Sequence, residues 1–157
     1  MEALDPITVS DWHRRFATDL FNQVWTLLDK TNRTPEENDH MLHAAHASRY
    51  HWGEIGTPLE FARGEWQISR VYAVLGRPEP AAYHAQRSLK LCQANGIGDF
   101  DLAFAYEALA RAAAVAGETA RCREFLGLAE GVAAEIKEHE DRIYLRSELV
   151  DVARMIR

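Results

Sequence analysis

A pattern repeated at an interval of 41 residues constrains the fold of this chain more than any other feature. Both copies have the spacing Ala-x3-residue-x3-Arg-x5-Gly, and a small residue, Ala81 or Cys122, follows each Gly by five positions. The matched residues are Ala62, Trp66, Arg70 and Gly76 in the first copy and Ala103, Glu107, Arg111 and Gly117 in the second. A fixed period of about 20 to 50 residues is typical of proteins that stack similar supersecondary units. We therefore expect a stack of helical units.

Helix start and stop signals divide the chain into about seven expected helices. Thr-Pro-x-Glu sequences that begin at Thr34 and Thr57 combine a capping box with Pro at the first helical position. No segment alternates polar and apolar residues as a strand does. The expected helices span about 10–32, 34–56, 57–76, 78–95, 98–117, 118–136 and 141–156.

Short connections between these helices predict that sequential neighbours pack antiparallel. The whole chain, residues 1–157, is therefore expected to form one all-α domain. Its parts would be a helix pair at 10–56, repeat units at 57–96 and 98–138, and a capping helix at 141–156. The outer side of that last helix is expected to carry the charges of Arg146, Glu148, Asp151 and Arg154.

The first expected helix carries more aromatic side chains than one packing face needs. One stripe, expected to face inward, consists of Trp12, Phe16, Leu20, Val24 and Leu27. Phe21 and Trp25 lie on an adjoining flank of the same helix. Because exposed apolar patches commonly mark contacts between proteins, we expect a homodimer formed through this helix.

Composition limits the cellular compartments and the classes of partner that we expect for this chain. The net charge of −6 would repel nucleic-acid backbones, so we expect no nucleic-acid partner. The N-terminus lacks the features of a signal peptide, and no apolar run approaches the roughly 18 residues of a membrane span. Cys92 and Cys122 lie within expected helices and are interpreted as small buried residues with free thiols. These features favour a cytoplasmic protein.

From Phe61 to about Ile136 the chain resembles tetratricopeptide-type (TPR-like) helical repeats. The small, Tyr and Gly positions of that family would be filled by Ser69, Tyr72, Gly76, Ala81 and Ser88 in one unit, and by Ala110, Ala113, Gly117, Cys122 and Ala129 in the next. The chain departs from the family pattern in its longer period, in Ala113 where Tyr is expected, and in the missing closing Pro. The whole chain also resembles a small family of uncharacterised prokaryotic proteins, which brings no activity with it.

The TPR-like resemblance implies a right-handed superhelical stack with a concave groove. Such grooves bind peptides, partner proteins or small ligands. No membrane partner is implied.

The second expected helix is rich in histidine and offers a candidate metal site. The candidate ligands on it are Glu37, His40, His43 and His46. Helical residues three or four apart are neighbours, and Glu-x-x-His is the helical ligand pair of di-iron bundles. Steps of three residues, however, turn around the helix by about 60° each, and no second Glu-x-x-His occurs. The alternative is a polar helix face with hydrogen-bonded histidines.

Two glutamates lie on apolar helix stripes, where a carboxylate is expensive to bury unless it is paired. Glu107 precedes Arg111 by four residues, and Arg63 and Arg70 are the alternative partners for Glu65 or a neighbour. One interpretation is an internal salt-bridge network that locks adjacent helices. The other makes these charges the floor of a groove, in which Arg70 and Arg111 hold an anionic group.

Further groove candidates are His84, His43 and Tyr50, with Trp52 and Trp66 as core residues or groove walls. His84 occupies the position that Phe125 fills in the next unit, so it is either a ligand contact or a half-buried, satisfied histidine. No nucleophile arrangement or phosphate-binding loop is present, so we expect no catalytic residue and no cofactor.

The leading hypothesis is therefore a non-catalytic scaffold that binds a protein, a peptide or a small anion. The alternative is a metal-dependent enzyme that uses the His-rich second helix with the buried glutamates.

Overall fold

The computed structural model describes residues 5–157, and these residues form helices joined by short connections, with no strand among them. The helices are α1 (Val9–Leu28), α2 (Pro35–Ile55), α3 (Pro58–Val74), α4 (Pro78–Ala94), α5 (Asp99–Val115), α6 (Thr119–Ala133) and α7 (His139–Met155). The predicted all-α class is confirmed. None of these helices combines the length and the apolar character needed to cross a bilayer.

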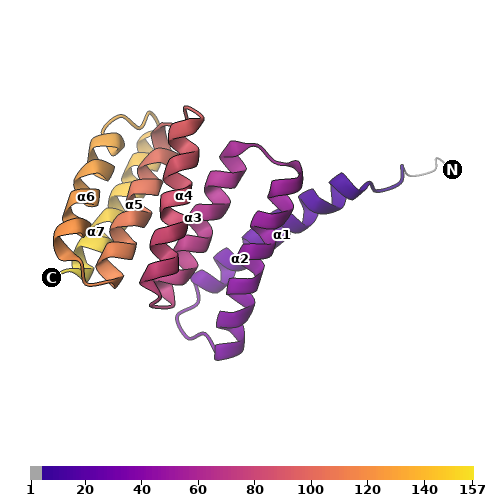
Figure 1. Ribbon diagram of the computed structural model, residues 1–157, viewed down its shortest axis with the longest axis horizontal. Coiled ribbons are helices and arrows are strands. Elements are labelled where there is room, and N and C mark those ends of the chain that lie inside the picture. Colours follow the sequence, from indigo (N-terminus) through magenta and orange to yellow (C-terminus); the bar gives the residue numbers. More distant parts are fainter. Residues whose placement is uncertain (1–4) are drawn as a thin grey trace.

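The helices follow one another across the molecule in sequence order, from α1 at one end to α6 and α7 at the other (Figure 1). Each helix packs on the next one in the chain, and α1, α3, α5 and α7 also contact one another in that order. Within the described chain, the backbones of α2, α4 and α6 do not pack directly on one another. The four odd-numbered helices therefore form a continuous layer, and we call its exposed surface the odd-helix face.

Local sequence explains where most helices begin and end. The capping boxes at Thr34 and Thr57 precede α2 and α3 as expected, and the backbone N–H of Thr34 donates to Glu37. Gly76 and Gly117 end the first helix of each repeat with φ of 73° and 77°. Because this left-handed conformation costs an L-residue energy that glycine avoids, the matched glycines of the repeat are helix stops.

Buried serines allow the helix backbones to approach closely. Ser48 on α2 donates its hydroxyl hydrogen to the carbonyl oxygen of Ala17 on α1 at 2.7 Å, and Ser69 on α3 donates to Ala81 on α4 at 2.7 Å. Ser88 on α4 donates to Ala62 on α3 at 2.9 Å. Each hydroxyl is thereby satisfied inside the core, and each bond fixes the register of two helices.

Three predicted helix boundaries were wrong. Thr8, not Ser10, caps α1, and its hydroxyl accepts from the N–H of Asp11 at 3.1 Å. The same helix ends at Leu28 and not near residue 32, because the Arg33 guanidinium donates to the carbonyl oxygens of Leu27 and Lys30 and folds the chain back. Helix α7 begins at His139, two residues before the expected start.

The predicted inward stripe of the first helix is correct only in its second half. Val24 is fully buried, but Trp12 and Phe16 expose 44% and 45% of their surface. The buried residue in that part of α1 is Ala17, which lies against Ser48. The first half of α1 lies at the end of the stack (Figure 1), and within the described chain α1 packs only on α2 and α3, which leave Trp12 and Phe16 partly exposed.

Candidate functional site

The residues predicted to line one groove lie in separate places. Arg70, Glu107 and Arg111 meet on the odd-helix face, whereas Glu65 and His84 lie in a second cluster between α2, α3 and α4. His43 and Tyr50 are exposed on α2, and the Tyr50 ring contacts the His51 ring at 5.5 Å.

Arg70 and Arg111 do converge, and two carboxylates lie between them. The Glu107 carboxylate accepts from Arg111 Nε at 2.8 Å and from Arg70 Nη2 at 3.4 Å. The Glu148 carboxylate, from α7, accepts from the same two guanidinium groups at 2.7 and 3.0 Å. The four side chains form a closed ring of alternating charge, which we call the ion-pair network, and it joins α3, α5 and α7.

The ion-pair network is buried and formally neutral. Glu107 is fully buried, and both arginine side chains are 12% exposed. Burial lowers the pKa of Arg70, but Glu107 and Glu148 outweigh it and hold that pKa above its ordinary value. Because two cations face two anions, an added anion would have to displace a carboxylate from the guanidinium groups.

The second cluster surrounds Glu65 on the other side of α3. The Glu65 carboxylate accepts from His84 Nδ1 at 2.7 Å and from Arg87 Nε at 3.2 Å, and Arg49 Nε lies 3.3 Å away. Gly64 makes room for this arrangement, since a Cβ there would lie 2.7 Å from Arg49 Cδ. We call these residues the Glu65 cluster, and it ties α2, α3 and α4 together.

The carboxylate of Glu65 stays ionised despite its burial. Burial raises the pKa of Glu65, but the hydrogen bonds from His84 and Arg87 outweigh it, so the pKa lies below its ordinary value. A carboxylate can only accept, so His84 carries its hydrogen on Nδ1. The His84 ring stacks on Tyr72, whose hydroxyl lies 2.9 Å from His46 Nε2.

Three of the four candidate metal ligands of α2 have other partners, and the fourth, His43, is exposed. Glu37 completes the cap of its own helix and pairs with Lys30, and His40 Nε2 lies 3.1 Å from the side-chain oxygen of Gln23. His46 contacts Tyr72 and His84. Among residues 5–157, no three His, Cys, Asp or Glu side chains gather closely enough to hold a metal ion.

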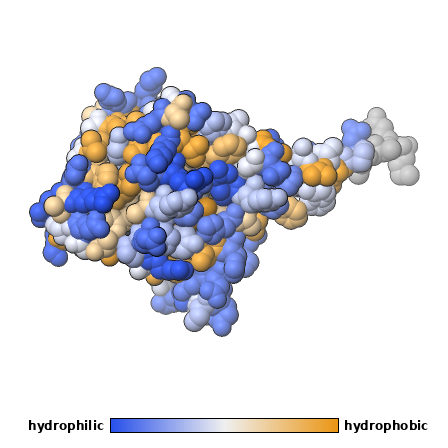
Figure 2. Space-filling model, viewed as in Figure 1, coloured by the Kyte–Doolittle hydropathy of each residue, from blue (hydrophilic) through white to orange (hydrophobic). Residues whose placement is uncertain are grey.

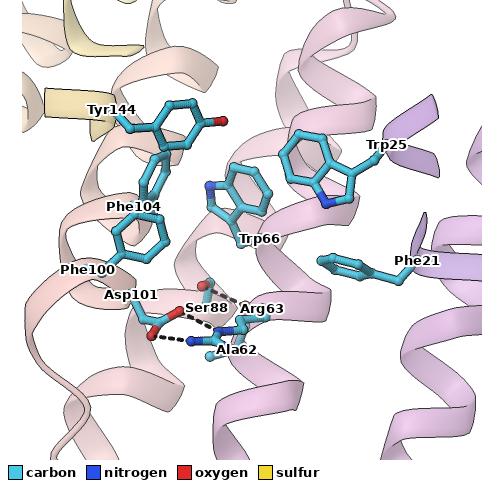
Figure 3. A pocket seen from close by; sticks show the side chains of 10 residues that line it. All are labelled: Phe21, Trp25, Ala62, Arg63, Trp66, Ser88, Phe100, Asp101, Phe104 and Tyr144. Carbon is cyan, nitrogen blue, oxygen red and sulfur yellow. Dashed lines mark hydrogen bonds and ion pairs between the residues drawn. The ribbon is translucent and has the colours of Figure 1, made fainter. Parts of the chain in front are cut away.

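An aromatic pocket, which the sequence analysis did not predict as a site, opens on the odd-helix face. Its volume is about 210 Å³. Six aromatic side chains line it: Phe21 and Trp25 from α1, Trp66 from α3, Phe100 and Phe104 from α5, and Tyr144 from α7 (Figure 3). Trp66 stands between the α1 rings and the rings of α5 and α7, with ring centroids 5.4 Å from Trp25 and 5.5 Å from Phe104.

Polar groups lie at the edge of this aromatic pocket. Arg63 binds Asp101 through two hydrogen bonds of 2.8 and 3.1 Å, which joins α3 to α5 below the rings (Figure 3). The indole Nε1 of Trp66 is buried and has no acceptor within the described chain. Arg70 links the pocket to the ion-pair network, because its guanidinium carbon lies 5.3 Å from the centroid of the Trp66 ring.

Sequence reasoning missed several residues because their signal was weak. Glu148 was expected on the charged outer side of the last helix, but it lies four positions after Tyr144, and both side chains face α5. Phe21 and Trp25 were recognised as surplus aromatics, and α1 directs them toward α3, where they line the pocket beside Trp66. The available signal was a pair of aromatic residues four positions apart in each of two helices, Phe21/Trp25 in α1 and Phe100/Phe104 in α5.

The lowered pKa values of two histidines, His51 and His46, indicate how the stability of the protein should depend on pH. Burial lowers the pKa of His51, and the charge of His13, whose Nδ1 lies 2.8 Å from His51 Nδ1, lowers it further. Burial and the neighbouring His84 likewise lower the pKa of His46. Below the unfolded pKa of about 6.5, the unfolded chain binds more protons than the folded one. The free energy of unfolding should therefore fall as the pH is lowered from 7 to 5.

Urea denaturation at several pH values measures this dependence. His51→Gln should make the decline between pH 7 and pH 5 shallower, because it removes one depressed histidine pKa. His139→Gln, at an exposed position at the start of α7, is the control and should leave the slope unchanged. A slope that His51→Gln does not alter would show that this histidine is not responsible.

No protein-family model, curated protein or solved structure matches this chain.

Proposed function

We propose that this protein is a non-catalytic, TPR-like binding module that holds an aromatic or bulky aliphatic side chain of a protein or peptide partner in its aromatic pocket. The observation that carries the proposal is the set of six aromatic side chains, contributed by four helices, around one opening. Rigid aromatic side chains supply large contact areas at a low entropic cost and dominate binding energy where they line pockets.

The size of the pocket favours a single side chain over a larger ligand. Pockets for drug-sized molecules and cofactors range from about 300 to 1,000 Å³. A volume of about 210 Å³ is smaller than that range. The polar groups at its edge, Trp66 Nε1 and the Arg63–Asp101 pair, suit the amide groups that accompany a side chain in a peptide.

The ion-pair network favours a peptide over a small anion. Arg70 and Arg111 were predicted to hold an anionic group, but each guanidinium already binds two carboxylates. A small anion would compete with Glu107, which is fully buried and preorganised. In the proposed module, this network keeps α3, α5 and α7 in place so that the pocket rings stay in position.

Titration with N-acetyl-tryptophanamide, followed by 1H–15N NMR, tests the proposal. We expect the indole N–H signals of Trp66 and Trp25 to shift, with a dissociation constant on the order of 1 mM, as suits one side chain alone. N-acetylglycinamide, which lacks the side chain, should shift neither signal. Tyr144→Ala and Trp25→Ala should each weaken binding at least about fivefold.

Tyr83→Ala is the matched control, because Tyr83 is 57% exposed on α4 and does not line the aromatic pocket. This variant should bind the probe as the unaltered protein does. The proposal is wrong if the probe shifts signals elsewhere on the molecule, or if binding survives both pocket substitutions.

A further inference from the structure

A second aromatic surface lies at the opposite end of α1 from the connection to α2. Val9, Trp12 and Phe16 expose 73%, 44% and 45% of their surface, and the Trp12 and Phe16 rings stack with centroids 5.6 Å apart. This part of α1 projects beyond the rest of the stack (Figure 1). Figure 2 shows hydrophobic residues on the projecting segment, next to the grey terminal residues.

The end of α2 continues this surface. The His51 ring lies 5.3 Å from Phe16 and 5.1 Å from His13, and the next ring along, Tyr50, is 62% exposed. We call Val9, Trp12, Phe16 and Tyr50 the N-terminal patch. It is supported from beneath by the two histidines, so its rings are held in place although they are exposed.

Beside the N-terminal patch, α1 carries a positive and a negative side chain that could pair with the same two side chains of a second, antiparallel copy of the helix. Arg15 and Asp19 are exposed on α1, four residues apart, and form no ion pair within the described chain. The guanidinium carbon of Arg15 lies 5.5 Å from the centroid of the Trp12 ring. If a second α1 runs antiparallel to the first, Arg15 of each helix can face Asp19 of the other.

We propose that a second copy of this chain covers the N-terminal patch, with the two α1 helices antiparallel and a twofold axis level with residue 17. In that register Arg15 of each copy lies opposite Asp19 of the other, since both are two residues from the axis. The two Phe16 rings meet across the axis. Such an isologous contact uses the same surface twice, as the self-complementary charges require.

The mass in solution gives the first test. Sedimentation equilibrium of the full chain should show a species of about twice the 17.8 kDa chain mass at micromolar concentrations. The double variant Trp12→Ser, Phe16→Ser should be a monomer with an unchanged circular dichroism spectrum. Tyr83→Ala, a substitution of an aromatic residue that is 57% exposed on α4, should remain dimeric.

Charge reversal tests the register. Arg15→Glu alone and Asp19→Arg alone should each raise the dissociation constant by at least about tenfold, because each places like charges opposite one another twice. The double variant Arg15→Glu, Asp19→Arg should recover the original constant. An equimolar mixture of the two single variants should form a heterodimer, since its paired positions are again opposite in charge.

Three results would overturn the proposal. The first is an unaltered chain that stays monomeric at concentrations on the order of 100 µM, where even a weak dimer would form. The second is a dimer that survives the Trp12 and Phe16 substitutions. The third is a dissociation constant that the single charge reversals leave unchanged. A mixture of the single variants that stays monomeric would contradict the antiparallel register.

Discussion

Glu107→Ala should lower the free energy of unfolding by about 3 to 5 kcal/mol, the range for removing one partner of a buried ion pair. The carboxylate is fully buried, and both Arg70 and Arg111 donate to it. Without it, two guanidinium groups with little exposure would share the single carboxylate of Glu148. Urea denaturation followed by circular dichroism at pH 7 measures the effect.

The same chain offers a matched control for this substitution. Arg146 binds Glu130 between α7 and α6, but both side chains are about half exposed. Glu130→Ala should therefore cost less than about 1 kcal/mol. Glu107→Gln should fall between the two, because the amide oxygen still accepts from an arginine while the charge is lost. Equal effects of Glu107→Ala and Glu130→Ala would show that burial does not strengthen the ion-pair network.

Glu65→Ala should destabilise the protein by about 2 kcal/mol at pH 7, as expected when buried donors lose their acceptor. The effect is smaller than for Glu107 because Arg87 is 47% exposed and can turn to water. Arg49 and His84 are more buried and would lose their common partner. Thermal or urea unfolding of the two forms measures the difference.

The dependence of stability on acid pH tests whether Glu65 stabilises the fold as an ionised carboxylate. Its pKa is lowered on folding, so its contribution is complete above the ordinary value of about 4.5 and is lost as the pH falls through the folded pKa. Glu65→Ala should therefore reduce the loss of stability between pH 5 and pH 3. Glu54→Ala, at an exposed position of α2, should not. An unchanged acid profile in Glu65→Ala would contradict the proposed ionisation.

Short-range features explain why so much of the fold could be predicted. Helix starts at Thr34 and Thr57 depend on side chains three residues from the cap, and the stops at Gly76 and Gly117 depend on one backbone conformation. These interactions lie within one turn of the chain. The error at the start of α1 has a similar origin, since Thr8 and Ser10 are both acceptable caps and only the Asp11 hydrogen bonds decide between them.

The candidate site was predictable only in part. That Glu65 and Glu107 must be paired follows from the cost of burying a carboxylate on an apolar stripe. Their partners could not all be found, because Arg70 and Glu148 are 78 residues apart and meet only when α3, α5 and α7 pack in one layer. The exposure of Trp12 and Phe16 could not be predicted either, because an apolar stripe on one helix does not show how far the neighbouring helices extend over it.

The sequence by itself determined the seven helices, most of their ends and the need to neutralise two buried glutamates, because these depend on hydrogen bonds and desolvation within a few residues. The tertiary structure alone decided that Arg70 and Arg111 share Glu107 and Glu148, and that six aromatic rings enclose a pocket. The physical reason is that these contacts join helices far apart in the chain. Their geometry is set by the packing of whole helices and not by local sequence.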